Sequence, residues 1–268
     1  MAANTVTATA GAMALAVALA ATQAAAWERD LGAGANVPSK WAYTGDNGPA
    51  HWGQLTPEFS VCSTGKLQSP VPLMTADAIS LPCEPLRFRY RSSSLYITND
   101  GKSLRLGYDR GSYVVIDGLS YELAELRFHV PAEHVIEGHV ADAELQLIHG
   151  NNRGDIAVVA VPILASRRVN QIFRRIVEHA PVVPGETYYG RNVGFNPLFL
   201  LPGRKDYFAY VGSLTIPPCS EGVHWYVMQT PVEVDGDDLM HLAQLMGPNA
   251  RPLQQLDGRR VANVCGEP

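Results

Sequence analysis

Recurrent turn signals constrain the fold of this chain more than any other feature. They separate short runs rich in β-branched and aromatic residues, a pattern typical of strands joined by turns. The clearest example is Tyr113 to Ile116, then Asp117-Gly118, then Leu119 to Leu123, because Asp-Gly supplies the two positive-φ residues of a type I′ hairpin turn. The sequence therefore predicts a mainly β chain. The other turn signals are Asn47-Gly48, Asp100-Gly101, Gly150 to Gly154, and Asp235-Gly236.

Two helices are expected against this β background. Residues 167–179 place apolar side chains three and four positions apart, and Pro181 follows their end. Residues 237–246 repeat the pattern over a shorter stretch, which begins with an Asp cap and stops at Gly247-Pro248. No linker, low-complexity tract or internal repeat interrupts the rest of the chain, so residues 27–268 are predicted to form one domain.

The charge composition argues against a nucleic-acid partner. The 268 residues include 21 Lys and Arg against 26 Asp and Glu, which gives a net charge of −5, and no extended basic run occurs. Nucleic acids and anionic membrane surfaces are bound through basic patches. We therefore expect no nucleic-acid partner.

The first 26 residues carry no charged side chain. An unbroken apolar run from Gly11 to Ala21 is followed by Ala24-Ala25-Ala26, an A-x-A pattern directly before Trp27. Residues 1–26 therefore resemble a cleaved export signal, although the usual basic start is missing. The second half of a bipartite plastid address and a membrane anchor are the alternatives. The run is shorter than the roughly 20 apolar residues that span a bilayer.

The cysteines indicate an oxidising compartment. Their number is even, none sits in a C-x-x-C pair, and no Cys/His cluster has zinc-finger spacing, so disulfides are expected. Disulfides persist outside the reducing cytosol. The protein is therefore expected to be exported, to the extracellular space, the periplasm or a plastid (thylakoid) lumen.

Two of the expected strands carry polar residues on one face. One alternating run places Arg127 and His129 on a shared face, and a later run does the same for Glu144, Gln146 and Ile148. If the two strands are neighbours in the sheet, these side chains surround a single point. Spacing alone leaves two interpretations open, a polar network that lines a cleft and a site that carries out chemistry.

Several segments together resemble the α-class carbonic anhydrases. The stretches from Glu125 to His134 and from Ala143 to His149 resemble the centre of that family's active site. The resemblance implies an α-carbonic anhydrase fold, with a central, twisted, largely antiparallel sheet of about ten strands and short peripheral helices. The other matching segments are Trp41 to Tyr43, Gly48 to Gly53, Gln68 to Pro70, Gly212 to Gly222, Arg251 to Gln254, and Leu256 to Arg259.

The chain departs from the family at the zinc-ligand positions. Family enzymes hold zinc with three histidines and leave a fourth position for water. The corresponding residues here are Arg127, His129 and Gln146. A guanidinium has no lone pair for a metal, and a neutral amide is a poorer ligand than an imidazole. The resemblance is therefore to the family's acatalytic carbonic anhydrase-related proteins, and it predicts no cofactor and no carbon dioxide hydration by a zinc-bound hydroxide.

Other family positions are retained, as the resemblance implies. Thr215 and Glu133 match the pair that orients the zinc-bound hydroxide, and Glu144 matches the carboxylate that steadies the third histidine. Lys102 stands at the position of the proton-shuttle histidine, where it would transfer protons less well than an imidazole. The apolar wall of the carbon dioxide pocket is matched by Ile148, Val158, Leu214 and Trp225, for which plain core packing is an equal alternative.

The resemblance also suggests how the cysteines pair. Cys62 and Cys219 match the pair that forms a disulfide in exported members of the family. Cys83 and Cys265 remain, and parity alone suggests that they form a second bridge.

Three functions follow from these residues. The first is an exported carbonic anhydrase-like module without a competent zinc site, which binds a protein partner or a larger lumenal or membrane-associated assembly. The second is a weakly active carbonate dehydratase with an unusual metal site around His129. The third is a subunit that binds bicarbonate or another small anion through Arg127 and the Thr215 hydroxyl. An internal ion pair between Arg127 and a carboxylate such as Glu125 is the alternative role for this charge.

Overall fold

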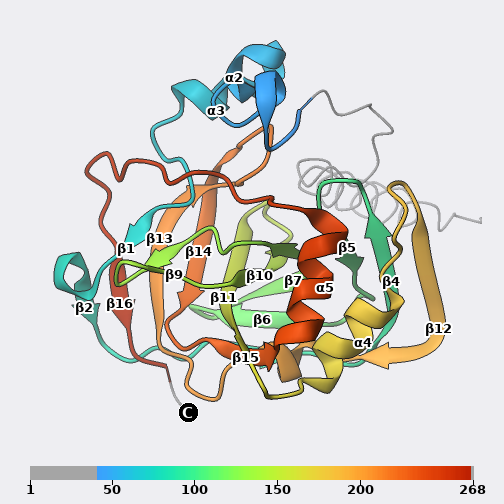
Figure 1. Ribbon diagram of the computed structural model, residues 1–268. Helices are drawn as coiled ribbons and strands as arrows, with labels where there is room; N and C mark the ends of the chain where they lie inside the picture. Colours follow the sequence, from blue (N-terminus) through green and yellow to red (C-terminus); the bar gives the residue numbers. More distant parts are fainter. Residues whose placement is uncertain (1–40, 267–268) are drawn as a thin grey trace, which may run out of the picture.

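The structure is a computed structural model that describes residues 41–266 (Figure 1). The predicted export segment, residues 1–26, lies outside the described residues. Within them, no helix is both long and apolar enough to cross a membrane.

One 13-stranded sheet forms the body of the molecule (Figure 1). Its main path runs β12-β4-β5-β7-β10-β11-β14-β13-β16-β2, while β3, β6 and β15 pair at its margin. Most neighbours are antiparallel, and the parallel exceptions are β11 with β14 and β15, and β16 with β2. The predicted mainly β, largely antiparallel fold is confirmed. The strands are β2 Ile79–Leu81, β3 Arg87–Arg89, β4 Ser93–Asn99, β5 Leu104–Gly107, β6 Tyr113–Ile116, β7 Leu119–His129, β10 Ala143–Gly150, β11 Ile156–Ser166, β12 Thr187–Phe195, β13 Tyr207–Ser213, β14 Glu221–Met228, β15 Val232–Asp235 and β16 Ala262–Val264.

A small three-stranded sheet and short helices surround this body. The small sheet consists of β1 (Pro72–Leu73), β8 (Val135–Ile136) and β9 (His139–Val140). The helices α4 and α5 contact each other over one part of the large sheet, whereas α2 and α3 lie together at its edge (Figure 1). The helical segments are α2 Trp52–Leu55, α3 Val61–Thr64, α4 Gln171–His179 and α5 Gly236–Met246, with the 3-10 turns η1 Gly45–Asn47, η2 Pro57–Phe59, η3 Thr75–Asp77 and η4 Pro197–Leu200.

The first predicted helix begins later than expected. It was predicted to start at residue 167, but α4 starts at Gln171 because the Asn170 side chain accepts hydrogen bonds from the backbone N–H groups of Ile172 and Phe173. An N-cap of this kind ends the extended backbone that precedes a helix. Val169, expected on the apolar stripe, lies before the helix and is exposed. The second helix, α5, follows its prediction closely.

The predicted hairpin is present, and it leads directly into the strand that carries the polar face. Strands β6 and β7 are antiparallel around Asp117 and Gly118, both of which have positive φ. Strand β7 then continues for 11 residues to His129. Its apolar side chains, such as Leu126 and Phe128, are fully buried in the main core, so its other face is turned toward the candidate site.

Two disulfides link distant parts of the chain. Cys62 is bonded to Cys219 and Cys83 to Cys265, which are the two expected pairings, and the described part of the chain contains no free cysteine. The first bridge closes a sequence separation of 157 residues and ties α3 to the loop that follows β13. That loop carries Thr215.

Candidate functional site

Strands β7 and β10 bring the polar residues together in register. The antiparallel pairing places Arg127 opposite Gln146 and His129 opposite Glu144. Residues opposite each other in an antiparallel pair lie on the same face of the sheet. The two polar-faced strands are therefore neighbours in the sheet, which was the condition for their side chains to meet.

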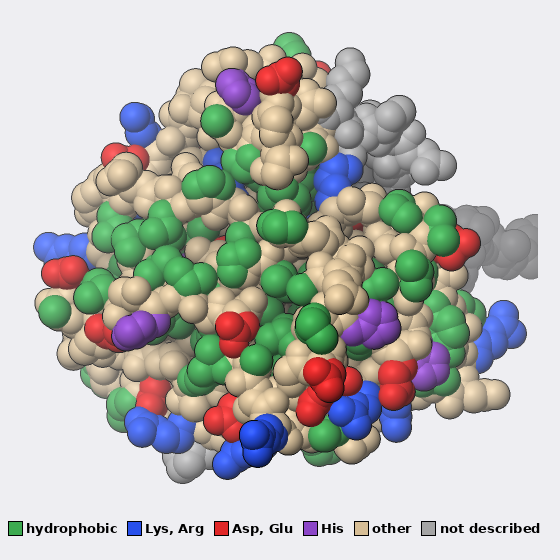
Figure 2. All heavy atoms as spheres, viewed as in Figure 1, with side chains coloured by type: hydrophobic (Ala, Val, Ile, Leu, Met, Phe, Trp, Pro, Cys, Tyr) green, Lys and Arg blue, Asp and Glu red, His purple; other side chains and the backbone are tan. Residues whose placement is uncertain are grey.

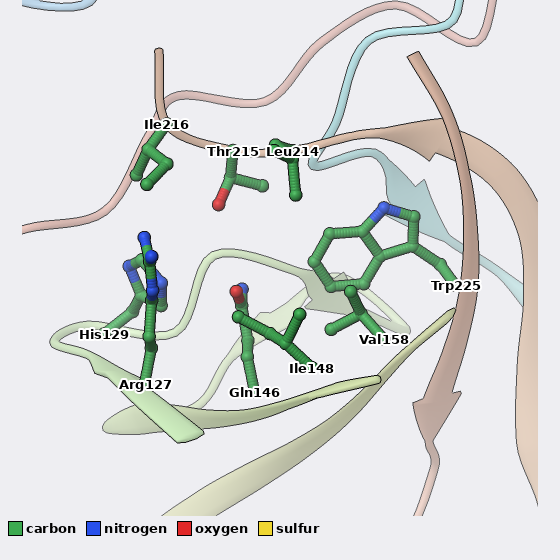
Figure 3. A pocket seen from close by; sticks show the side chains of 9 residues that line it. All are labelled: Arg127, His129, Gln146, Ile148, Val158, Leu214, Thr215, Ile216 and Trp225. Carbon is green, nitrogen blue, oxygen red and sulfur yellow. The ribbon is translucent and has the colours of Figure 1, made fainter. Parts of the chain in front are cut away.

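These side chains form one wall of a small cavity (Figure 3). The cavity itself has a volume of about 10 Å³, and the wider space around it, which includes open solvent, is about 280 Å³. Thr215 points its hydroxyl into the cavity from the loop after β13, facing Arg127 and Gln146 across it (Figure 3). The four residues expected to form an apolar wall do line it, and Ile216, which the sequence analysis did not single out, joins them. The apolar lining is Ile148, Val158, Leu214, Ile216 and Trp225.

Arg127 is buried and paired with a carboxylate on its own strand. Its Nε lies 2.5 Å from Oε1 of Glu125, and only 5% of the residue is exposed. The other oxygen of Glu125 lies 2.8 Å from Nη2 of Arg105 on β5. One carboxylate therefore lies between two guanidinium groups, and the three side chains together carry one excess positive charge.

Gln146 is held by two carboxylates. Its Nε2 donates to Oε2 of Glu133 at 2.8 Å and to Oε1 of Glu144 at 2.9 Å. Both amide hydrogens are used in these bonds. If the amide were rotated by half a turn, its oxygen would face the two carboxylates, which cannot donate to it. The Oε1 atom of Gln146 is therefore left to face the cavity.

His129 has one ring nitrogen bonded and one without a partner. Its Nδ1 lies 2.8 Å from the backbone oxygen of Asn249, and 3.4 Å from Oε1 of Glu133. A carbonyl oxygen only accepts, so Nδ1 carries the proton in this bond. The Nε2 atom is buried and has no hydrogen-bond partner among the described residues. In the neutral ring that atom holds the lone pair.

Glu133 and Thr215, which match the pair that orients the zinc-bound hydroxide, have different partners in this structure. Glu133 accepts from the backbone N–H of Arg251 at 2.9 Å and from Gln146 at 2.8 Å. Within residues 41–266, no hydrogen bond connects it to the Thr215 hydroxyl, although that residue lines the cavity and is only 4% exposed. Gln146 and the Arg251 backbone therefore each occupy one oxygen of the Glu133 carboxylate.

Glu144 makes an ion pair behind the cavity. Its carboxylate accepts from the backbone N–H of His134 at 2.9 Å and lies 3.0 Å from Nδ1 of the same residue. Burial raises the pKa of Glu144, but the charge of His134 and the hydrogen bonds from His134 and Gln146 outweigh it and lower the pKa to about 2. His134 also contacts Tyr210, with Nε2 2.8 Å from the phenol oxygen. The sequence analysis quoted His134 within a matching segment but gave it no role, and its spacing alone carries no signal.

Lys102 lies away from the cavity wall. Its ammonium group is 4.9 Å from the centre of the Trp41 ring, an arrangement typical of a cation–π contact. Its backbone oxygen accepts a hydrogen bond from Nδ2 of Asn249. The residue at the expected proton-shuttle position is thus held against the aromatic ring.

The polar wall offers few ligands to a zinc ion. His129 presents one imidazole nitrogen and Gln146 one amide oxygen, but the Arg127 guanidinium has no lone pair and its charge opposes a dication. Across residues 41–266, no group of three His, Cys, Asp or Glu side chains is placed to hold a metal ion. The residues of this chain therefore do not fit a zinc ion held by three imidazoles.

Comparisons with known proteins identify relatives along most of the chain. The sequence model of a family described as eukaryotic-type carbonic anhydrase matches residues 47–265. A carbonic anhydrase of Nostoc sp. is 35% identical over 224 residues, which cover 82% of this chain and 84% of the relative.

Two similar solved structures cover nearly their whole chains. The α-carbonic anhydrase of Thermovibrio ammonificans, in complex with the inhibitor sulfanilamide, has a TM-score of 0.80 at 36% identity and covers 83% of this chain and 98% of its own. Dioscorin complexed with ascorbate has a TM-score of 0.79 at 28% identity and covers 85% of this chain and 99% of its own.

These comparisons contradict the prediction that no cofactor is expected. The relatives are named as carbonic anhydrases, and the carbonic anhydrases of this class are zinc-dependent. Zinc is therefore the cofactor that the comparisons indicate, against the expectation drawn from Arg127 and Gln146. In this chain, Arg127 and Gln146 occupy two of the three positions at which the family enzymes hold zinc with histidines.

Proposed function

The chain belongs to the eukaryotic-type carbonic anhydrase family, and from its site we propose that it binds a small oxygen-bearing anion such as bicarbonate instead of hydrating carbon dioxide. The observation that carries the proposal is the position of Arg127. Its guanidinium lines the cavity beside Gln146 on the neighbouring strand, and at both positions the resemblance predicts zinc-ligand histidines. A fixed cation in this place favours an anion.

The charges around Arg127 support this proposal. Glu125 carries one negative charge and contacts two guanidinium groups, so these three side chains together carry one positive charge. The effective dielectric constant of a buried site is lower than that of water, which strengthens the attraction between this charge and a bound anion. The Thr215 hydroxyl, which makes no bond to Glu133, is available to donate to the same anion.

A relative of the same fold supports an oxygen-bearing ligand, although the cavity of this chain is narrow. The cavity between the apolar and the polar wall has a volume of about 10 Å³, the space of a single water molecule, so an anion of several atoms enters only if side chains on the open side move apart. Dioscorin, which shares the fold, is known in complex with ascorbate, itself an oxygen-rich anion at neutral pH. This scaffold is therefore compatible with an oxygen-bearing organic ligand.

We place this function in an exported protein that acts as a binding module for a partner or larger assembly. The two disulfides support an oxidising compartment, whether extracellular, periplasmic or a plastid lumen. On the face shown in Figure 2, basic and acidic side chains are interspersed, and this face has no continuous basic patch of the kind that binds nucleic acid.

Weak carbonate dehydratase activity with an unusual metal site is the second candidate. It is favoured by the zinc-dependent relatives and by the unpartnered Nε2 of His129. Elemental analysis of protein purified without a chelator, combined with a carbon dioxide hydration assay, separates the two functions. Stoichiometric metal together with measurable hydration would favour this candidate over the anion-binding module.

The test of the anion site is titration calorimetry with sodium bicarbonate on the wild type and on Arg127→Met. Methionine keeps much of the length of the side chain and removes the charge, and Glu125 keeps its partner Arg105. We expect binding to weaken by about tenfold to a hundredfold, the value of charge-assisted hydrogen bonds.

The matched control is Arg168→Met, which removes an arginine whose side chain is 82% exposed and pairs with Glu233 at the surface. Its bicarbonate affinity should equal that of the wild type. Equal affinities in the wild type and in Arg127→Met would overturn the proposed site.

A further inference from the structure

We infer that His129 makes this anion site selective for anions that carry an O–H group, such as bicarbonate, over proton-free anions of the same shape, such as nitrate. The inference rests on the proposed anion site and adds a residue that determines its specificity. Nothing in the family resemblance assigns this role, because there the corresponding histidine is a zinc ligand.

The bond to Asn249 fixes which ring nitrogen of His129 faces the ligand as an acceptor. Nδ1 donates to the backbone oxygen of Asn249 at 2.8 Å, and the Asn249 side chain is itself held, since its Oδ1 accepts from the backbone N–H of Val130 at 2.7 Å. The ring is 1% exposed and cannot turn without breaking this bond. Nε2 is therefore presented as an acceptor on the wall of the cavity.

A second acceptor lies beside it on the same wall. Gln146 uses both amide hydrogens on Glu133 and Glu144, so its Oε1 faces the cavity. Its amide cannot rotate to offer a hydrogen instead, because two carboxylates would then face the amide oxygen. The wall formed by His129 and Gln146 accepts hydrogen bonds, while Arg127 and Thr215 donate them.

A ligand that satisfies both kinds of group must accept and donate. Bicarbonate is planar, carries one negative charge spread over oxygens that accept from Arg127 and Thr215, and has one O–H that donates to Nε2 of His129. Nitrate has the same shape and charge but no hydrogen to donate. With nitrate bound, the buried Nε2 would stay unpaired, and leaving a buried polar atom without a partner weakens binding by about tenfold or more.

The experiment compares sodium bicarbonate with sodium nitrate in closed-cell titration calorimetry on the full chain at mildly alkaline pH. The variant is His129→Asn, whose side-chain amide can still donate to Asn249 but cannot reach the position of Nε2. The matched control is His179→Asn on α4, which changes a histidine whose Nδ1 lies 2.8 Å from the backbone oxygen of Arg175, far from the cavity.

We expect the wild type and His179→Asn to bind bicarbonate at least about tenfold more tightly than nitrate, and His129→Asn to bind the two anions equally. A measurement on the unmodified protein keeps the inference testable if His129→Asn fails to fold. In that measurement the ¹⁵N resonance of His129 Nε2 should shift when bicarbonate is added and stay in place with nitrate.

Equal affinities for the two anions in the wild type would overturn the role of His129 and leave the anion site standing. Absence of binding by either anion would instead overturn the proposed function itself.

Discussion

Replacing Glu144 with glutamine should change how acid affects the stability of the protein. Glu144 is 1% exposed, and its carboxylate accepts from both the ring and the backbone of His134. Burial alone would raise its pKa above the ordinary value of 4.5. The charge of His134 and its hydrogen bonds prevail and lower the pKa to about 2 in the folded state.

The sign of the effect follows from comparing the folded and unfolded states. In the unfolded chain the Glu144 carboxyl takes up its proton near pH 4.5, whereas in the folded protein it does so near pH 2. The ionised carboxylate therefore stabilises the fold above pH 4.5, and this contribution is lost as the pH falls toward 2. The difference between these pKa values corresponds to about 3 kcal/mol, of which about 2 kcal/mol is lost by about pH 3.

Urea unfolding of the wild type and of Glu144→Gln, at pH steps from neutral to about 3, measures this contribution. Protonation of His149 in acid also lowers the unfolding free energy, because burial lowers the pKa of His149 from 6.5 to about 4 in the folded state. This loss is the same in the wild type and in Glu144→Gln. The difference in unfolding free energy should be constant above about pH 5 and should narrow by about 2 kcal/mol at about pH 3. A difference that stays constant over the whole range would refute the argument that His134 holds Glu144 ionised.

Two further predictions concern the ligand positions and the disulfide. Arg127→His combined with Gln146→His should raise the zinc content of the purified protein above that of the wild type, because the register sets both new imidazoles beside His129 on one face. Elemental analysis measures the gain, and a folded double variant with wild-type zinc content would contradict the placement of the ligands. Replacing Cys62 and Cys219 by serine should lower the unfolding free energy by about 3–5 kcal/mol, because the bridge restricts a long loop in the unfolded chain. Urea unfolding tests this, and an unchanged midpoint would show that the bridge adds no stability.

Local sequence patterns predicted the strands and which side chains of β7 and β10 lie on the polar face of each strand. A period of two places Arg127 and His129 on one face regardless of their neighbours, and the Asp-Gly turn sets where β7 begins. Once β7 and β10 are neighbours, their facing residues follow from the alternation. The start of α4 was missed because a side-chain cap at Asn170 overrides an apolar pattern that extends further back.

The hydrogen bonds within the site could not be predicted from spacing. Glu133 matches a position that orients a zinc-bound hydroxide, but its oxygens accept from Gln146 and from the backbone N–H of Arg251, which is 118 positions away in the sequence. Which of several acceptors a buried donor chooses depends on distances of a few tenths of an ångström. Such choices are set by the packing of the whole sheet, and no periodic pattern in the sequence encodes them.

The substitutions at positions 127 and 146 act together on the carboxylates around the cavity. Glu125, Glu133 and Glu144 are all buried, and an unpaired buried carboxylate would cost several kcal/mol. Arg127 supplies a charge to the first of them, and the two amide hydrogens of Gln146 serve the other two. Protein groups alone thus satisfy the three carboxylates around the cavity. Each carboxylate also has a second partner, in Arg105, the backbone N–H of Arg251 and His134 respectively, so a change at either position alone leaves each of them with one partner.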